Sequence, residues 1–336
     1  MKYLQKENPY KPKNSEGFSF CVSLQNQDIN ANMNNSTFEE TSYQSHESWF
    51  TKQYPDEAKR LNTITKWQQS VKDKTVDYWL HERLFQLANP LIKVNDHWLT
   101  VGDGYGFDAN YLANRGCKVM ATDIGGAFLP LVKSQGLIDD YSVENVEKLT
   151  FADNSFDYAF CKEAYHHFPR AYIGVYEMIR VAKKGIILVE PQDPLTKMPL
   201  MLAIKNILDR FDSTILQKYW KNRYSFEEVG NYVFKLSDRE MEKIAMGMNL
   251  PAIAFKGINN AYWKPGLDTE IANESSTPFR QIQSKIRRDN FLCKLGILPY
   301  QVLSAVIFKI LPDNETIQNL KNEGYLYYEF PKNPYL

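Results

Sequence analysis

The chain has 336 residues, of which 43% are hydrophobic and 24% charged, a composition typical of one large globular domain or two smaller ones. Lys and Arg together number 40, as do Asp and Glu, so the net charge is zero, which argues against a nucleic-acid-binding protein. The four cysteines form no Cys-x-x-Cys pair, which argues against a zinc site and a disulfide framework, and we predict no metal site.

The first 90 residues divide into two segments of different character. Residues 1–45 are polar, rich in Asn, Ser and Gln, and lack hydrophobic periodicity, so we predict a flexible arm or lid. From residue 46, apolar residues recur at spacings of three and four until Pro90. This spacing predicts a helical cap over residues 46–90.

Beyond residue 90, short apolar runs alternate with amphipathic segments. We expect strands at 98–101, 118–122, 156–161 and 186–189, and helices at 107–114, 127–134 and 169–181. Strands that alternate with helices in this way form βαβ units with parallel strands. The sequence therefore predicts an α/β fold with a doubly wound, mainly parallel sheet.

The part of the chain after Pro194 is mainly helical in pattern. We expect helices at 198–211, 224–229, 237–247, 278–295 and 299–310. A strand is expected at 252–256, and the alternating tail at 325–330 is expected to pair beside it. We therefore predict one α/β domain over residues 91–336, with a helical insertion at about 264–322.

A glycine-rich loop follows the first expected strand of this domain. Gly102, Gly104 and Gly106 lie between that strand and the next helix. Glycine lets the turn tighten and brings backbone close to a ligand, while the helix N-terminus favours a negatively charged group. Asp123 ends the next strand, about 20 residues further on, where a carboxylate accepts hydrogen bonds from ribose hydroxyls. Together they predict a site for an adenosine-containing cofactor.

The spacing of the glycines argues against a dinucleotide. The dinucleotide fingerprint places its third glycine three positions after the second. Here Gly106 follows Gly104 by two positions, and Phe107 stands where that third glycine would be.

Three motifs resemble those of class I S-adenosylmethionine-dependent methyltransferases, in the small-molecule, type 11-like branch. Thr-Val-Gly-Asp-Gly-Tyr-Gly at 100–106 is similar to their first motif, and residues 145–157 resemble their adenine loop. Ala-Tyr-His-His-Phe at 164–168 is similar to their segment after the fourth strand. The resemblance covers residues 98 to about 191 and implies a Rossmann-like fold with S-adenosylmethionine as cofactor.

The resemblance also implies a set of cofactor-binding residues. In the family, the loop contacts methionine and ribose, the acid after the second strand holds the ribose, and the next residue packs on adenine. The adenine loop lies at the ring edge, and the end of the fourth strand passes near the methionine. The corresponding residues here are Gly102, Asp103, Gly104, Gly106, Asp123, Ile124, Asn145, Val146, Cys161 and Lys162.

The chain departs from the family pattern at three positions. Thr100 stands where the family often has an acid, and Asp103, at a position that is usually small, is a candidate substitute for it. Asn145 replaces a common Asp, so its amide oxygen is the candidate acceptor for the adenine amino group.

Candidate catalytic residues follow the fourth and fifth strands. His166 and His167 should lie near the transferred methyl group, and a histidine titrates near neutral pH, as a base must. We expect His167 to act as the base ahead of His166. Glu190 ends the fifth strand at the same edge and could bind or deprotonate the acceptor. The alternative for all three is a structural role in packing or in a turn.

We therefore predict methyl transfer to a small-molecule acceptor. A sugar or polysaccharide precursor is one candidate, because the regions outside the core are polar and aromatic. An NAD-dependent oxidoreductase and a catalytically inactive cofactor-binding adaptor are the alternatives. The first residues lack a signal-peptide pattern and the longest apolar stretch, 295–311, is interrupted by polar residues, so we expect a cytoplasmic protein without stable membrane insertion. Oligomeric state and the methylated atom type stay open.

Overall fold

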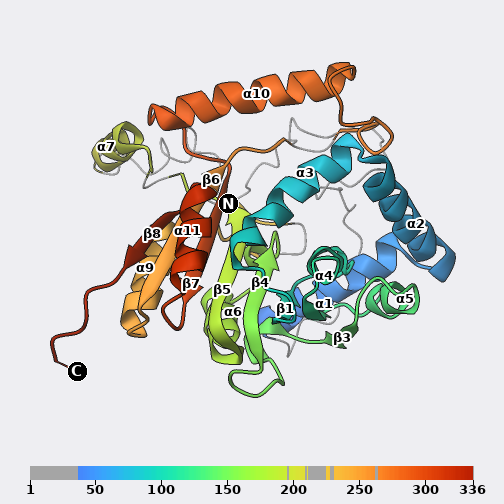
Figure 1. The fold of residues 1–336 in the computed structure, drawn as a ribbon, viewed down its shortest axis with the longest axis horizontal. Helices are drawn as coiled ribbons and strands as arrows, with labels where there is room; N and C mark the ends of the chain where they lie inside the picture. The colour runs from blue at the N-terminus through green and yellow to red at the C-terminus, as the bar shows by residue number, and fades with distance from the viewer. Residues whose placement is uncertain are drawn as a thin grey trace, which may run out of the picture.

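The computed structural model describes residues 37–194, 197–208, 210, 225–227, 231–261 and 264–335. Its centre is one sheet of eight strands (Figure 1). The strands are β1 (His97–Val101), β2 (Lys118–Asp123), β3 (Asp140–Val143), β4 (Phe156–Lys162), β5 (Ala182–Pro191), β6 (Ala252–Ile258), β7 (Val302–Phe308) and β8 (Leu326–Glu329).

The strand order across the sheet is β3-β2-β1-β4-β5-β7-β6-β8. The first five strands in this order are parallel, whereas β7 runs antiparallel to β5 and β6, and β8 runs antiparallel to β6. The chain proceeds outward from β1 in one direction and from β4 in the other, so the connections leave the sheet on opposite sides between these strands. Ligands of doubly wound sheets bind at such a switch point, at the carboxyl ends of the strands.

Helices pack around this sheet, and the described chain before β1 is mainly helical. The α-helices are α1 (Phe38–Gln53), α2 (Glu57–Asp73), α3 (Val76–Phe85), α4 (Phe107–Ala113), α5 (Leu129–Ser134), α6 (Ala171–Val181), α7 (Pro199–Leu208), α9 (Asp238–Gly247), α10 (Thr277–Lys294) and α11 (Asn314–Asn322). Short 3-10 helices are η1 (Gln86–Leu91), η2 (Val146–Lys148) and η3 (Tyr165–His167). No helix in the described residues is both long and apolar enough to cross a membrane.

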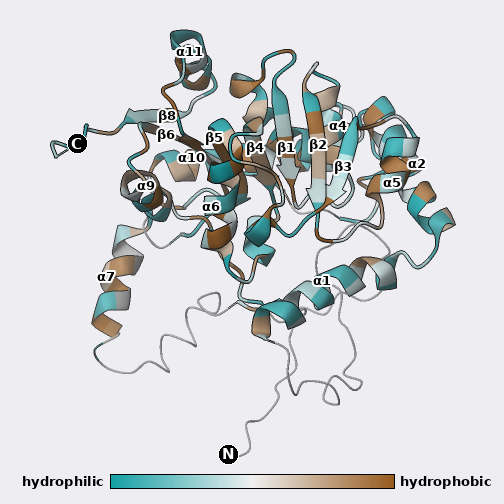
Figure 2. Cartoon of the chain, turned by 90° about the horizontal axis from the view of Figure 1, so that it is seen from below, coloured by the Kyte–Doolittle hydropathy of each residue, from teal (hydrophilic) through white to brown (hydrophobic). Residues whose placement is uncertain are grey.

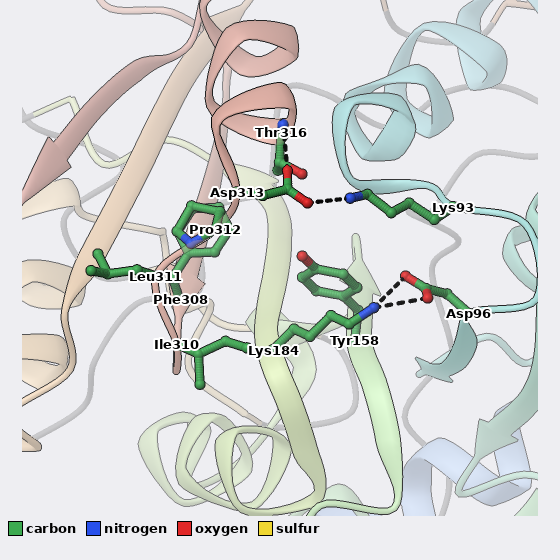
Figure 3. Close-up of a pocket in the computed structure, with 10 residues that line it drawn as sticks. All are labelled: Lys93, Asp96, Tyr158, Lys184, Phe308, Ile310, Leu311, Pro312, Asp313 and Thr316. Carbon is green, nitrogen blue, oxygen red and sulfur yellow. Dashed lines mark hydrogen bonds and ion pairs between the residues drawn. The ribbon is translucent and has the colours of Figure 1, made fainter.

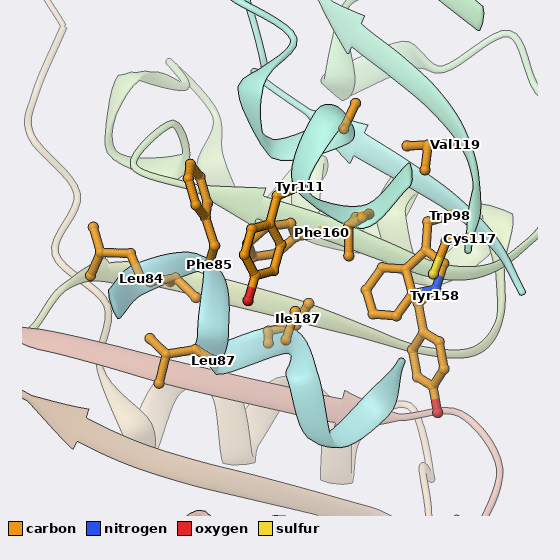
Figure 4. Packing of buried hydrophobic residues seen from close by; sticks show 14 of the residues in the cluster. Leu84, Phe85, Leu87, Trp98, Tyr111, Cys117, Val119, Tyr158, Phe160 and Ile187 are labelled. Carbon is orange, nitrogen blue, oxygen red and sulfur yellow. The ribbon is translucent and has the colours of Figure 1, made fainter. Parts of the chain in front are cut away.

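Two hydrophobic clusters cover the two faces of the sheet. Helices α2 to α5, η1 and α11 pack on one face, whereas α6 and α9 pack on the other. On the first face, Trp98 and Tyr158 of neighbouring strands lie in the same cluster as side chains of α3, η1 and α4 (Figure 4). Trp67 of α2 stacks on Phe107 of α4 with ring centroids 4.0 Å apart, a contact that adds about 1 kcal/mol to the burial of both rings.

Helix α1 crosses the carboxyl ends of the central parallel strands. In Figure 2 it lies across the tips of β1, β2 and β3, with its axis roughly perpendicular to them. Its N-terminus is fixed by a capping box, in which Thr37 and Glu40 satisfy each other's backbone N–H groups. The sequence therefore provides a stable helix that covers the switch point.

The doubly wound α/β fold is confirmed, with the helical cap over residues 46–90. The tail strand also pairs as expected, since β8 lies beside β6. Three local predictions were wrong or incomplete. Residues 38–45, assigned to the flexible arm, begin α1; residues 225–227 are not helical; and β3 was not predicted. Residues 1–36 lie outside the described residues.

The predicted helix at 299–310 is also wrong, because this segment forms β7. The run Val-Leu-Ser-Ala-Val-Ile-Phe at 302–308 is buried along its whole length and pairs with β5 on one side and β6 on the other. A strand buried on both faces shows no alternation, so periodicity alone does not separate it from a buried helix. Its short length and its β-branched residues were the available signals. β7 thus interrupts the helical insertion that we expected at 264–322.

Candidate active site

A cavity of about 490 Å³ lies between α1 and the carboxyl ends of β1, β2 and β4. Its walls combine aromatic side chains of α1 with polar groups from the ends of the strands. Predicted cofactor residues that line it are Gly102, Asp123, Ile124, Asn145 and Val146, and of the predicted catalytic residues His167 does. The structure therefore brings residues from distant parts of the sequence to one site.

The glycine loop makes a tight turn that only glycine fits at its start. Gly102 has a φ of +69°, and a Cβ there would lie 2.2 Å from the Cβ of Ala164. Gly104 lies against α1 and β2, since a Cβ there would stand 2.6 Å from Phe50 and 3.2 Å from Asp123 Oδ2. The loop backbone therefore lies directly beside Asp123, and Phe50 covers Gly104 from the side of α1.

Asp103 is directed into the start of α4 and not toward the cavity. Its carboxylate accepts hydrogen bonds from the backbone N–H of Ala109 at 2.8 Å and from the hydroxyl of Thr100 at 3.0 Å. Burial raises the pKa of Asp103 to about 6, although these donors favour the charged form. Asp103 and Thr100 together hold the loop against the helix.

Asp123 ends β2 and is only 8% exposed. Its Oδ1 accepts a hydrogen bond from the Gly125 N–H at 2.6 Å, while no group of the described residues donates to Oδ2. Burial raises the pKa of this carboxyl to about 7. An oxygen without a donor in a lined cavity is suited to accept hydrogen bonds from ligand hydroxyls.

The adenine-loop segment forms the next wall of the cavity. Asn145 caps η2, and its Oδ1 accepts a hydrogen bond from the Glu147 N–H at 2.9 Å. This amide oxygen, predicted to meet the adenine amino group, thus already has one donor, although an amide oxygen can accept a second. Val146 is 8% exposed and offers an apolar surface beside it.

Cys161 and Lys162 lie beneath the cavity and do not line it. Lys162 Nζ lies 3.3 Å from Asp108 Oδ1 and 3.6 Å from Glu163 Oε2. Burial alone would lower the pKa of Lys162, but these carboxylates hold it above its ordinary value. The buried ammonium therefore links the end of β4 to α4.

Glu190 anchors the turn that carries the two histidines. It has no exposed surface, and its Oε1 accepts hydrogen bonds from the N–H groups of Ala164 and Tyr165 at 2.7 and 2.8 Å. Its Oε2 lies 2.6 Å from His166 Nδ1. Burial opposes charge on His166, but the Glu190 carboxylate raises its pKa above the ordinary value. Neither residue lines the cavity, so both act on the turn in this structure.

His167 faces the cavity and is paired with an acid from a different segment. Its Nδ1 lies 2.6 Å from Glu227 Oε2, and its ring packs edge-on against His46 of α1 at a centroid distance of 5.3 Å. Burial, and then the neighbouring His166, lower the pKa of His167, whereas Glu227 opposes that shift. Burial is the main cause that lowers the pKa of His46 to about 4, and the neighbouring His167 contributes to the same shift. Both rings in the cavity therefore favour the neutral form.

The comparisons with known proteins bear on the first half of the sheet. A protein-family model described as a methyltransferase domain matches residues 99–189, from β1 to β5, including the glycine loop and Asp123. Residues 99–189 therefore match a methyltransferase domain, whose cofactor is S-adenosylmethionine.

Several solved structures are similar to this chain at low sequence identity. One is YcgJ from Bacillus subtilis, 18% identical over 69% of this chain and 100% of that one, with a TM-score of 0.44. Another is an S-adenosylmethionine-dependent methyltransferase from Methanosarcina mazei, 19% identical over 67% and 98%, with a TM-score of 0.41. A third, from Aquifex aeolicus, is 24% identical over 32% of this chain and 62% of that one, with a TM-score of 0.29. No curated protein matches the chain.

The residues of the methyltransferase domain fit the cofactor. Asp123 Oδ2 is the acceptor that a ribose diol needs, and the backbone of Gly102 lines the same cavity. Ile124 and Val146 offer the apolar surface that an adenine ring needs. The contacts predicted for Asp103, Gly104, Gly106, Cys161 and Lys162 stay predictions, since none of these lines the cavity.

The sequence does not indicate that α1 and the loop at 225–227 contribute side chains to the cavity. His46, Trp49 and Phe50 line the cavity from α1, and Glu227 does so from the loop. The helical spacing of Trp49 and Phe50 indicated a cap, but only the folded chain shows that the cap lies over the strand ends. No motif or periodic pattern in the sequence around Glu227 marks it as a site residue.

A second cavity, of about 190 Å³, lies at the opposite edge of the sheet (Figure 3). Its two lysines are paired, Lys93 with Asp313 and Lys184 with Asp96. These ion pairs leave no charged group of the cavity directed at a ligand. The cavity under α1, which is lined by the predicted cofactor residues, is therefore the candidate functional site.

Proposed function

We propose that this methyltransferase transfers a methyl group to a small molecule bound in the cavity under α1, beside His167 and Glu227. The observation that carries the proposal is the position of the His167–Glu227 pair, which opens on the same cavity as Asp123 and Gly102. When bound, S-adenosylmethionine supplies a methyl group on a positively charged sulfur. The chain itself must hold the acceptor in line and exclude water.

His167 is the proposed base for an acceptor with a hydroxyl group. A base needs a neutral ring at neutral pH and a partner that orients it, and Glu227 supplies the partner at 2.6 Å. The His–carboxylate contact also stabilises the ring once it has taken the proton of the acceptor. Trp49 and Phe50 line the cavity from α1, where their rings would limit the access of water.

His166 and Glu190 are proposed as positioning residues. Glu190 fixes the backbone of the 164–166 turn, and His166 shares that carboxylate, so together they set where His167 stands. The backbone before them is unusual, because Glu163 has a φ of +51°. Such a conformation in a non-glycine residue is costly and is found where the surrounding contacts impose it.

The acceptor class follows from the walls of the cavity. The aromatic residues of α1 and Phe226 face polar groups from the strand ends. Sugars and polysaccharide precursors present hydroxyls together with apolar ring faces, and we include them first among the candidate acceptors. The alternatives, an NAD-dependent oxidoreductase and an inactive adaptor, are not favoured by the match to a methyltransferase domain.

The test is transfer of radiolabelled methyl groups from S-adenosylmethionine to a panel of sugars, nucleotide sugars, phenols and amines. With an acceptor identified, His167→Gln should reduce kcat by about 100-fold or more while cofactor affinity changes little. His166→Gln should reduce kcat less, and its effect should disappear in the His167→Gln background because it acts through that residue. Full turnover of His167→Gln would refute the base.

A further inference from the structure

Three side chains of the cavity form a group that none of the predictions assigned. His46, His167 and Glu227 each offer one possible metal-ligand atom, and these atoms all lie within 4.8 Å of one another. They come from three separate segments, α1, η3 and the 225–227 loop. The cysteine spacing predicts no metal site, and no spacing rule joins histidines and acids that lie so far apart in the sequence.

The distances within the group suit a site that closes around an ion. Two atoms bound at about 2.1 Å to one ion lie about 3.0–3.4 Å apart. His167 Nδ1 and Glu227 Oε2 are 2.6 Å apart, so this pair would open slightly. The widest separation in the group, at most 4.8 Å, would close by about 1.5 Å. Shifts of this size are within the range of side-chain rotation.

The surroundings already orient the rings. His46 Nε2 lies 3.1 Å from Asn231 Oδ1, and Asn231 is fully buried. The side-chain amide of Asn231 also donates to the backbone oxygen of His166 at 3.2 Å, and the backbone carbonyl of Asn231 accepts from the Glu227 N–H at 2.9 Å. Outer hydrogen bonds of this kind fix the ligands of metal sites. Asn231 thus links all three segments of the group.

The donor set and its exposure indicate the kind of ion. Two imidazoles and one carboxylate with further positions open are typical of catalytic zinc and non-haem iron sites, whereas closed structural sites use four protein ligands. All three residues line the cavity, so open positions would face the acceptor space. Hard ions such as Mg²⁺ prefer oxygen ligands and fit this set less well.

We propose that His46, His167 and Glu227 bind one divalent first-row transition-metal ion in the cavity under α1. The bound ion joins α1 to the turn after β4 and to the 225–227 loop. Its open positions would hold an oxygen or nitrogen atom of the acceptor. Metal binding does not depend on the proposed methyl transfer, although an ion on His167 would take the place of the base there.

The experiment is equilibrium dialysis of the metal-stripped full-length protein against Zn²⁺, followed by elemental analysis, with Co²⁺ absorption spectra as a second probe. Wild type should retain one equivalent. His46→Gln, His167→Gln and Glu227→Gln should each weaken binding by at least about 100-fold, because each removes one of three ligands. His97→Gln is the matched control, since His97 lies at the start of β1 on the opposite edge. Circular dichroism confirms that each variant is folded.

The outcomes separate the two proposals. The metal site is overturned if wild type and all three variants retain zinc equally, or if wild type retains no zinc. Bound zinc without methyl transfer to any acceptor refutes the proposed function alone. Methyl transfer that is unchanged by chelation, in a protein that binds no zinc, leaves His167 as the base and refutes the metal site alone. Thermal denaturation with Zn²⁺ gives an independent readout, because an ion that joins three segments should raise the Tm of wild type and not of His46→Gln.

Discussion

Replacement of Asp123 by Asn should stabilise the protein and weaken its cofactor binding. Asp123 is buried, and its pKa is raised to about 7 because burial disfavours the charged form. In the unfolded chain this carboxyl ionises near its ordinary pKa of about 3.9. The folded protein therefore loses stability as pH rises from the lower of these values to the higher. The three units between them correspond to a destabilisation of about 4 kcal/mol above pH 7, at about 1.4 kcal/mol per unit.

Asp123→Asn removes this cost and keeps the acceptor for the Gly125 N–H. Urea denaturation without cofactor should show the variant more stable than wild type at about pH 8, and the difference should shrink by about 2–3 kcal/mol at about pH 5, where most folded wild type is protonated. Equal stabilities of wild type and variant at both pH values, or a less stable variant at the higher pH, would refute the assignment of Asp123 as a buried acid whose charged form is disfavoured without ligand.

The same substitution should weaken S-adenosylmethionine binding by about 100-fold, since two hydrogen bonds to a charged group are lost. Binding of ribose hydroxyls favours the ionised form of Asp123, so wild-type affinity should rise with pH up to the pKa of about 7 and then level off. Calorimetry over this range should show that affinity depends more steeply on pH in wild type than in the variant. The variant lacks the Asp123 carboxyl, so it serves as the reference for the ligand's own ionisation. Parallel pH profiles would contradict the linkage.

Four further substitutions test the parts of the site separately. Gly102→Ala should destabilise the fold by about 2 kcal/mol or more in urea denaturation, because its φ is +69° and its Cβ would lie 2.2 Å from a neighbouring Cβ. Lys162→Met removes the cation beside the buried carboxyl of Asp108 and the partly exposed carboxyl of Glu163, and should cost about 3–5 kcal/mol near neutral pH in urea denaturation. Phe50→Ala uncovers Gly104 and should speed cofactor association several-fold in stopped-flow fluorescence; an unchanged rate would mean that α1 does not cover the loop. Glu227→Gln should lower kcat by about 10-fold or more at unchanged cofactor affinity in methyl-transfer assays.

The features that could be predicted from the sequence are those encoded locally. The glycine loop, Asp123 and the histidine pair each lie within a few residues of a strand end, and parallel strands bring those ends to one edge. Periodicity also located the central strands and most helices. It missed β3, whose four residues Asp-Tyr-Ser-Val are too short and too polar to stand out, and it misread β7, whose two buried faces hide the alternation.

The features that could not be predicted depend on tertiary placement. Nothing in the polar segment before residue 46 indicates that α1 will start at Phe38 and cross the switch point. Only that crossing brings His46 within reach of His167 and Glu227. Asp103 is a similar case, because its position in the glycine loop suggested ligand contact, whereas its carboxylate caps the start of α4. Glu190 was correctly placed at the edge, but the backbone it holds is visible only in the folded chain.

We expect the cavity under α1 to bind S-adenosylmethionine. Calorimetric titration of the wild-type protein with S-adenosylmethionine, S-adenosylhomocysteine and NAD tests it most directly, with Asp123→Asn as the control. S-adenosylmethionine and S-adenosylhomocysteine should bind with about micromolar affinity, Asp123→Asn should bind them about 100-fold more weakly, and NAD should not bind. Binding of NAD, or an affinity for S-adenosylmethionine that is unchanged in Asp123→Asn, would contradict the assignment of this cavity.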